Sequence, residues 1–348
     1  MLLPQVLEIQ SLSHAIIAFA LSAIVILAVG LRLSRYADIL ADRTGMGEAL
    51  AGAVLLGAST SASGIVTSIS AASTGDVNLA YSNSLGGIAA QTAFLVIGDI
   101  WYRRANLEHA AAEITNVTQA TLLCLLLIIP LVTYALPQVT FWGIHPTSLV
   151  LPLVYAFGLQ LARRDRKDPM WLPKNTPDTR TDEPEAEDPN APATKLVAIQ
   201  FAALVVVVAI AGLVIARSGI FIAEASGLKQ SVVGAMLTAV ATSLPELVTT
   251  IAAIRRGALQ LAVGGIIGGN MFDVLFLSAS DIAYRDGSIY GAIDDSSRFW
   301  VLATIVMTLI LLLGLIRREK SGPGNIGFES VAVLFVYIAA AIIAGTIL

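Results

Sequence analysis

Long apolar segments constrain this chain more than any other feature of its sequence. A helix needs about 20 mostly apolar residues to cross the hydrocarbon core of a bilayer. Ten such segments are found, at residues 12–33, 47–70, 76–100, 115–136, 144–162, 195–216, 228–253, 258–283, 298–316 and 326–347. Charged residues make up only 13% of the chain, against about 25% in soluble domains. We therefore expect an all-α integral membrane protein with ten transmembrane helices, embedded in a lipid bilayer.

One hydrophilic segment interrupts the apolar pattern between the fifth and sixth spans. Residues 163–194 are rich in Pro, Asp and Glu, a composition that cannot bury enough apolar surface to fold alone. We interpret this segment as a linker between a first transmembrane half, residues 1–162, and a second half, residues 195–348. Each half then contains five spans, so the second half enters the membrane in the opposite direction to the first.

The positive charges predict the orientation. Of the 21 Lys and Arg residues, 17 lie in the loops after the first, third, fifth, seventh and ninth spans, and four lie on the other side. Cytoplasmic loops of membrane proteins carry an excess of these residues. The linker is therefore expected to be cytoplasmic and both termini outside. The compact loops favour the plasma (inner) membrane of a prokaryote.

Two segments of the chain, about 47–100 and 228–283, are related by an internal repeat. Shifting the sequence by 182 positions gives 18 identities over the 49 positions from 52 to 100. The matched groups include Gly52 with Gly234, Thr60-Ser61 with Thr242-Ser243, Gly86-Gly87 with Gly268-Gly269, and Asp99-Ile100 with Asp281-Ile282. Combined with an odd number of spans in each half, this predicts two inverted five-helix repeats. Such repeats are typical of secondary transporters, whose site lies at the bilayer midplane between interrupted helices.

The stretch ATSLPELVTT places a proline and a glutamate in the middle of a predicted span. Pro245 has no N–H, so the carbonyl group of Ala241, four residues earlier, loses its helical partner. Thr242 and Glu246 are four residues apart and share one helix face, and Ser243 lies beside that face. A carboxylate at the centre of a membrane helix costs about 2.5–3.5 kcal/mol on insertion scales. A cavity lined by oxygen atoms and holding a cation would offset that cost.

The stretch GGIIGGNMFDVLF supplies a second carboxylate on the next predicted span. Asn270 and Asp273 are three residues apart and therefore share a helix face. Glu246 and Asp273, on neighbouring midplane helices, form a candidate pair of metal ligands for a divalent cation. All of these ligands are hard oxygen atoms, which suit sodium, calcium or magnesium better than soft metals.

Other chemistries find little support in the sequence. Cys124 is the only cysteine, which excludes an internal disulfide and a cysteine-based zinc site. The three histidines, His14, His109 and His145, are far apart and form no zinc-protease pattern. We also find no pairing of a nucleophile with a base, so we expect no enzyme, no cofactor and no nucleic-acid partner.

Two stretches of the second half, ATSLPELVTTIAAIRRG and LAVGGIIGGNMFD, resemble the second alpha-repeat of the cation/calcium exchanger superfamily. This superfamily includes the sodium/calcium exchangers and their proton-coupled relatives, and the resemblance covers essentially the whole chain. It implies alternating access, in which one calcium ion moves against several sodium ions or protons. Glu246 and Asp273 would then bind calcium. Thr242 and Ser243 would supply oxygen atoms to sodium, and Ala241 would supply a carbonyl group.

The first repeat departs from the family pattern at the ligand positions. Ser63 and Gly64 stand where the family usually has a Pro-Glu pair, although Thr60 and Ser61 are kept. Gln91 stands where the family has the terminal Asn of this repeat. The site therefore has two carboxylates where the calcium exchangers of the family typically have three acidic groups.

Glycine also replaces the serine expected in both glycine-rich motifs, at Gly87 and Gly269. Asn83 remains in the first repeat, whereas its counterpart in the second repeat is Gly265. The full set of candidate cation-binding residues is Glu246, Asp273, Gln91, Thr60, Ser61, Thr242, Ser243, Ala241, Asn270 and Asn83.

These features predict a secondary active cation antiporter that moves calcium or another divalent cation against sodium or protons. Two negative charges balance one divalent ion but balance three sodium ions poorly, so ordinary three-for-one exchange is not expected. A carrier of monovalent cations and protons stays open, as does a non-transporting homologue with a degraded first repeat. The sequence leaves the oligomeric state undetermined.

Overall fold

The computed structural model describes residues 9–44, 60–179, 193–322 and 326–348. These residues are helical and contain no β-strand beyond one isolated bridge between Phe141 and Ile144. The elements are α1 (Leu12–Thr44), α4 (Ala62–Ser73), α5 (Val77–Trp101), α6 (Leu107–Ala110), α7 (Ile114–Ala135), α8 (Thr147–Lys167), α9 (Thr194–Ser226), α10 (Gln230–Val232), the π-helix η2 (Val233–Thr238), α11 (Ala239–Thr242), α12 (Leu244–Arg256), α13 (Leu259–Asp273), α14 (Leu275–Ala283), α15 (Ile289–Ala292), α16 (Asp295–Arg317) and α17 (Phe328–Thr346). The expected all-α architecture is confirmed for the described residues.

Most of the predicted spans coincide with observed helices. Within the described residues, seven helices are long and apolar enough to cross a membrane, and the bent pair Gln230–Thr242 and Leu244–Arg256 would make an eighth. The chain is therefore a multi-pass helical membrane protein. The second predicted span, 47–70, falls largely outside the described residues, which begin again at residue 60.

Four helices, α1, α8, α9 and α16, are longer than their predicted spans. α1 and α9 each contain 33 residues, which corresponds to about 50 Å at 1.5 Å per residue, against about 30 Å of hydrocarbon. The limits 12–33 and 195–216 were too short because hydropathy marks only the part embedded in lipid. α8 likewise runs past residue 162 to Lys167. The first five residues assigned to the linker are therefore helical, since a charged turn is stable in water.

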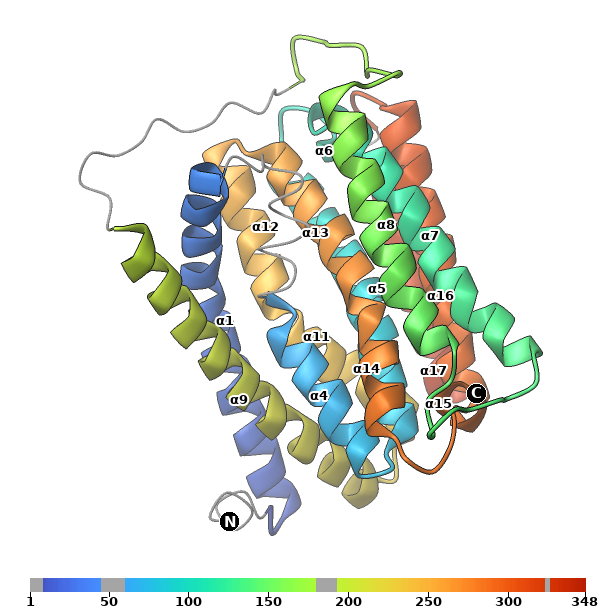
Figure 1. Cartoon of the computed structure of the whole chain (residues 1–348). Helices are drawn as coiled ribbons and strands as arrows, with labels where there is room; N and C mark the ends of the chain where they lie inside the picture. Colours follow the sequence, from blue (N-terminus) through green and yellow to red (C-terminus); the bar gives the residue numbers. More distant parts are fainter. Residues whose placement is uncertain (1–8, 45–59, 180–192, 323–325) are drawn as a thin grey trace.

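The helices form two groups in space. α1 and α9 lie against each other along one side of the bundle, as Figure 1 shows, and they contact α4 and α12. α5 and α13 are the most enclosed spans and contact one another, and α7, α8, α16 and α17 cover them on the other side. This arrangement places α4, α5, α12 and α13 between the two groups.

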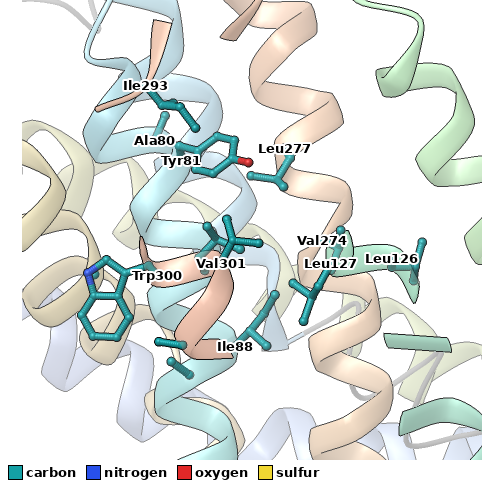
Figure 2. Close-up of a cluster of buried hydrophobic side chains, with 14 of the residues drawn as sticks. Ala80, Tyr81, Ile88, Leu126, Leu127, Val274, Leu277, Ile293, Trp300 and Val301 are labelled. Atoms are coloured by element: carbon teal, nitrogen blue, oxygen red, sulfur yellow. The ribbon is translucent and has the colours of Figure 1, made fainter. Parts of the chain in front are cut away.

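An apolar cluster joins the second group of helices, which contains α7, α8, α16 and α17, to the central helix α5. It joins side chains of α5, α7, α14 and α16, and Figure 2 shows Tyr81, Leu126, Leu277 and Trp300 among them. Each of these side chains is at most 1% exposed. Burial of a large apolar side chain stabilises a fold by roughly 1.5–3 kcal/mol in water. Where these helices face lipid, burial of apolar side chains contributes less to stability, and close packing between helices must contribute more.

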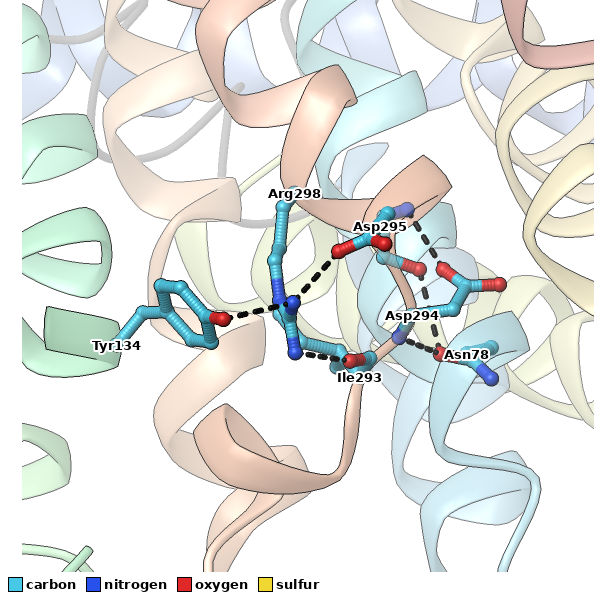
Figure 3. A network of polar contacts seen from close by, with 7 residues as sticks. Asn78, Tyr134, Ile293, Asp294, Asp295 and Arg298 are labelled. Carbon is cyan, nitrogen blue, oxygen red and sulfur yellow. Dashed lines mark hydrogen bonds and ion pairs between the residues drawn. The ribbon is translucent and has the colours of Figure 1, made fainter. Parts of the chain in front are cut away.

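A polar network fixes the start of α16 (Figure 3). Arg298 donates from Nη1 to Asp295 Oδ1 at 2.6 Å and to the hydroxyl of Tyr134 at 2.9 Å, and from Nη2 to the carbonyl of Ile293 at 2.8 Å. Asp294 caps the helix by accepting from the backbone N–H of Ser297 at 2.7 Å. The network therefore ties the first turn of α16 to α7.

Residues 182 positions apart make equivalent hydrogen bonds. Asp99 accepts from the backbone N–H of Leu107 at 2.9 Å, and Asp281 accepts from that of Ile289 at 2.9 Å. Their other carboxylate oxygens accept from four further donors, which are Gly327 N and Ser330 Oγ for Asp99, and His145 N and Ser148 Oγ for Asp281. In this set 107 pairs with 289, 145 with 327 and 148 with 330, always at the offset of 182 found in the sequence.

Glycines allow helices to approach closely at the centre. A Cβ atom added to Gly86 would collide with the backbone of Ala235, and one added to Gly212 would lie 2.7 Å from the Cα of Ser63. Small residues permit such backbone contacts between membrane helices. The first contact joins α5 to η2, and the second joins α9 to α4.

We expect Gly86→Ala to destabilise the protein strongly. Overpacking costs about 1–3 kcal/mol, and here the obstacle is backbone, which cannot move aside by rotating a side chain. The midpoint of thermal unfolding in detergent should fall by several degrees. The matched control is Gly345→Ala in α17, where no atom lies within 4 Å of the added Cβ. An unchanged midpoint for Gly86→Ala would contradict the close approach of α5 and η2.

Candidate cation-binding site

Two helix starts meet at the centre of the bundle. α11 ends at Thr242, and α12 begins at Leu244 with Pro245 in its first turn, so that the two segments are bent by 42°. α4 begins at Ala62, directly after Ser61. Figure 1 shows α4 and α11 side by side, with α12 continuing from α11. The break follows from Pro245, which has no N–H to donate along the helix.

A hydrogen bond joins the first turn of α4 to the break between α11 and α12. Ser63 Oγ donates to the carbonyl oxygen of Thr242 at 3.1 Å. That carbonyl is at the C-terminal end of α11, where helical carbonyl groups have no partner within the helix. Ser63 and Pro245 occupy equivalent positions of the repeat. The serine of the first repeat therefore satisfies a carbonyl at the helix break, next to the carbonyl of Ala241 whose donor Pro245 removes.

The two predicted carboxylates lie at this junction and are almost fully buried. Glu246 and Asp273 are 3% and 2% exposed. Ser61 Oγ donates to Glu246 Oε1 at 3.3 Å and also lies near the carboxylate of Asp273. Thr60 is within hydrogen-bonding range of Glu246. Both hydroxyl residues of the first repeat are therefore placed at the carboxylates of the second.

Gln91 connects Asp273 to Ser243. Its Nε2 donates to Asp273 Oδ2 at 2.6 Å and to Ser243 Oγ at 3.3 Å. Gln91 is 1% exposed. The interaction spans the two repeats, because α5 carries Gln91 and α13 carries Asp273. A short bond to a carboxylate is charge-assisted and holds that carboxylate in a fixed orientation.

Four buried oxygen atoms at the site accept no hydrogen bond from any described residue. They are Glu246 Oε2, Asp273 Oδ1, Gln91 Oε1 and Asn270 Oδ1. Native proteins leave few buried polar groups unpaired, and a buried anion without a partner is costly. A cation at this position would interact with carboxylate and amide oxygens at once. The donor set is composed of hard oxygens, as calcium and sodium require.

The remaining predicted residues make mainly internal contacts. Thr242 Oγ1 donates to carbonyl groups of its own helix, at 2.9 Å to Thr238 and 3.2 Å to Ala239. Asn83 donates to Gly64 O at 3.2 Å and to Ser68 Oγ at 3.0 Å, and it accepts from Thr238 Oγ1 at 2.8 Å. These bonds make Asn83 a link between α4, α5 and η2.

Two further candidates keep an oxygen that could face a cation. Asn270 Nδ2 donates to Thr92 Oγ1 at 3.0 Å, which leaves its Oδ1 unpaired. The carbonyl of Ala241 is the group deprived of a donor by Pro245, and Ala241 is 5% exposed. Among the described residues, no cluster of three or more His, Cys, Asp or Glu could hold a metal ion. The site therefore combines two carboxylates with neutral oxygens.

Phe276 is a residue at this site that sequence reasoning missed. A Cβ atom added to Gly64 would lie 2.7 Å from Cε2 of the Phe276 ring and 3.7 Å from Thr242 Oγ1. The ring thus occupies the space beside the position where the superfamily pattern has its first-repeat glutamate. Phe276 is three residues after Asp273, which places it on the same helix face and was the available signal.

Gly87 lies against the other side of the site. A Cβ atom there would lie 3.5 Å from Ser243 Oγ, 3.6 Å from Asp273 Oδ2 and 4.0 Å from Gln91 Nε2. These distances are ordinary van der Waals contacts, so a small side chain could be accommodated. The missing serine of the first repeat therefore corresponds to a position that faces the carboxylate.

A broken membrane helix with paired buried carboxylates is the arrangement of secondary cation transporters. A sequence model of the family described as sodium/calcium exchanger protein matches residues 14–161 and 195–345. The chain belongs to this family.

Curated relatives are matched over less than half of their length. The sodium/calcium exchanger MaX1 of Methanosarcina acetivorans is 34% identical over 124 residues, which are 35% of this chain and 33% of that protein. The putative antiporter CaxA of Alkalimonas amylolytica is 30% identical over 112 residues, or 32% and 35% of the two chains. The inner membrane protein YrbG of Escherichia coli is 26% identical over 147 residues, or 42% and 45%.

Solved structures extend the likeness of fold to the whole chain. The sodium-calcium exchanger NCX_Mj matches with a TM-score of 0.63 at 17% identity, over 95% of this chain and 98% of that one. The H+/Ca2+ exchanger CAX matches with a TM-score of 0.67 at 17% identity, over 96% of this chain and 85% of that one. These similarities establish an exchanger fold.

Proposed function

We propose that the protein is an antiporter that moves calcium, or another divalent cation, against sodium or protons by alternating access. The cation would bind at Glu246 and Asp273, with Gln91, Ser61 and Ser243 completing the site. The observation that carries this proposal is the set of buried oxygens without a hydrogen bond on Glu246, Asp273 and Gln91. Their combined charge of about −2 matches one divalent ion, because opposite charges in a site of low polarity need close balance.

The architecture proposed with this function is two inverted repeats of five spans. The hydrogen bonds of Asp99 and Asp281, which are equivalent at a separation of 182 residues, support it. So does the break in the second repeat beside Pro245, which the start of α4 mirrors in the first. The distribution of Lys and Arg further supports a cytoplasmic linker and termini on the outer side.

The contact between Gly64 and Phe276 favours an exchanger with fewer cation positions. The ring fills the space beside Gly64, where a third carboxylate would otherwise be attached. A site with two carboxylates, in which the Phe276 ring occupies the space beside Gly64, holds less positive charge at one time. We therefore propose a lower ratio of counter-ions to calcium than the three-for-one exchange implied by the superfamily pattern.

Uptake of radioactive calcium into proteoliposomes tests this function. Vesicles containing the purified protein would be given an outward sodium gradient in one arm and an outward proton gradient in the other. Uptake above that of empty vesicles, in either arm, would support antiport and identify the coupling ion. No uptake in either arm by folded protein would contradict calcium antiport. Parallel assays with magnesium and monovalent cations would then test the carrier alternative.

We expect Gly87→Ser to fold normally and to strengthen dependence on sodium. The new hydroxyl would lie beside Ser243 and Asp273, where it could supply one more neutral oxygen. A hydroxyl adds one hard oxygen ligand, which sodium can use, without adding the negative charge that would favour a divalent ion. The measurement is the sodium concentration that gives half-maximal competition with calcium, which should fall. Gly345→Ala is the control. An unchanged sodium concentration for Gly87→Ser would show that Gly87 does not face the bound ions.

A further inference from the structure

A basic pocket lies where α5 and α12 end, away from the carboxylate site. Its volume is about 740 Å³, and its lining residues are Trp101, Tyr102, Arg103, Arg104, Ile254, Arg255, Arg256, Gly257 and Leu259. The end of α12 and the residues after α5 each contribute a pair of arginines. The pocket is at the end of the bundle to which α8 and the linker lead, opposite the C-terminus (Figure 1).

The chemistry of the lining selects an anion. Four arginines line one pocket, and the other described residues of its lining include no Asp or Glu. A guanidinium group presents planar pairs of N–H donors that match phosphate oxygens. Arginines from two different helix ends border this one pocket, whereas a topology signal depends only on the number of positive charges in a loop.

The surroundings of the pocket point to a lipid and not to a soluble anion. Ile97, Ile100 and Trp101 are 40%, 50% and 50% exposed, and their spacing places them on one face of α5. This apolar face leads along the helix to the rim of the pocket. The guanidinium of Arg255 lies 4.8 Å from the centre of the Trp101 ring. Aromatic side chains at a helix end sit at the level of lipid headgroups.

We propose that this pocket binds the headgroup of an anionic phospholipid, with the acyl chains lying along the exposed face of α5. A headgroup with two phosphates offers these arginines more acceptor oxygens than a headgroup with one phosphate. The predicted orientation places the pocket at the cytoplasmic leaflet, where anionic lipids attract basic residues. This binding site is separate from the carboxylates, and its test does not depend on transport.

The position of the pocket gives the bound lipid a mechanical role. α12 carries Glu246 in its first turn and Arg255 and Arg256 in its last. A lipid held by those arginines and by Arg103 and Arg104 restrains α12 relative to the end of α5. The lipid should therefore stabilise the folded protein in detergent, because it binds the folded chain and not the unfolded one.

Thermal unfolding of the detergent-purified full chain tests the proposal. Cardiolipin, phosphatidylglycerol, phosphatidylcholine and inorganic phosphate would be titrated in separate arms. Cardiolipin should raise the unfolding midpoint most, phosphatidylglycerol less, and phosphatidylcholine and inorganic phosphate little or not at all. An equal effect of phosphatidylcholine would overturn an anion site. An equal effect of inorganic phosphate would overturn a lipid as the ligand.

Variants locate the binding. The double variant Arg104→Gln with Arg255→Gln should weaken cardiolipin binding, measured by native mass spectrometry, by about tenfold or more, because two charge-assisted contacts are lost. The matched control replaces Arg217 and Arg285, which lie in other parts of the structure, with Gln and should retain the parental affinity. If the double variant does not fold, the single variant Arg104→Gln replaces it. Parental affinity in a folded variant would overturn the assignment.

Discussion

Replacing Glu246 with Gln should reduce calcium uptake to that of empty vesicles while leaving the fold intact. The amide keeps the size of the side chain and can still accept from Ser61, which now lies 3.3 Å from Oε1. It removes one of the two negative charges that would balance a divalent ion. It also relieves the electrostatic repulsion between Glu246 and Asp273. We therefore expect the unfolding midpoint, measured without calcium, to stay level or rise.

This opposite effect on transport and stability separates function from folding. A buried carboxylate kept only for structure would lower stability when replaced, because its hydrogen bonds would be lost. Glu224→Gln is the matched control, since Glu224 is exposed at the far end of α9. It should retain parental uptake and midpoint. Normal uptake by Glu246→Gln would show that the carboxylate pair is not the transport site.

Gly64→Glu and Phe276→Ala should each destabilise the protein when made alone and should compensate when combined. A glutamate at position 64 would meet the Phe276 ring, whose nearest atom is 2.7 Å from an added Cβ. Overpacking of this kind costs about 1–3 kcal/mol. Phe276 is 2% exposed, and removal of a buried Phe side chain costs about 3–5 kcal/mol. In the double variant, the glutamate side chain would enter the space left by the ring.

A double-mutant cycle measures this compensation. Residues in direct contact show interaction energies of about 0.5–3 kcal/mol, whereas independent sites add. We expect the double variant to be more stable than the sum of the single effects and to bind more counter-ions per calcium. Phe335→Ala is the control substitution, because Phe335 is 72% exposed on α17. Strict additivity between positions 64 and 276 would contradict the role assigned to Phe276.

The internal repeat made much of the site predictable. Gln91 and Asp273 are equivalent at an offset of 182, and the structure joins them by a 2.6 Å hydrogen bond. An axis that relates two halves brings equivalent residues near that axis together, so repeat partners at the centre tend to touch. The contact of Ser61 with Glu246 does not follow from this rule, because the repeat partner of Ser61 is Ser243 and that of Glu246 is Gly64.

Other features could not be predicted because they depend on packing between distant segments. Phe276 has Phe94 as its repeat partner, and nothing in that match indicates that its ring lies beside Gly64. Asn83 is a predicted ligand, and the sequence does not indicate that its amide links three helical segments. The predicted lengths of α1 and α9 were wrong for a different reason. Hydropathy detects long apolar runs, and it does not detect the turns of α1 and α9 that continue past those runs.

The placement of charge has a consequence for the energetics of the proposed cycle. Both carboxylates belong to the second half of the chain, whereas the first half contributes Thr60, Ser61 and Gln91, which are neutral. If the two halves of the chain were identical, the inward-facing and outward-facing forms would have equal free energy. In the proposed cycle, the cation would stay with the second half while the first half moves past it. The resting equilibrium would then favour one face, and the two sides of the membrane should present different half-saturation concentrations for the same ion.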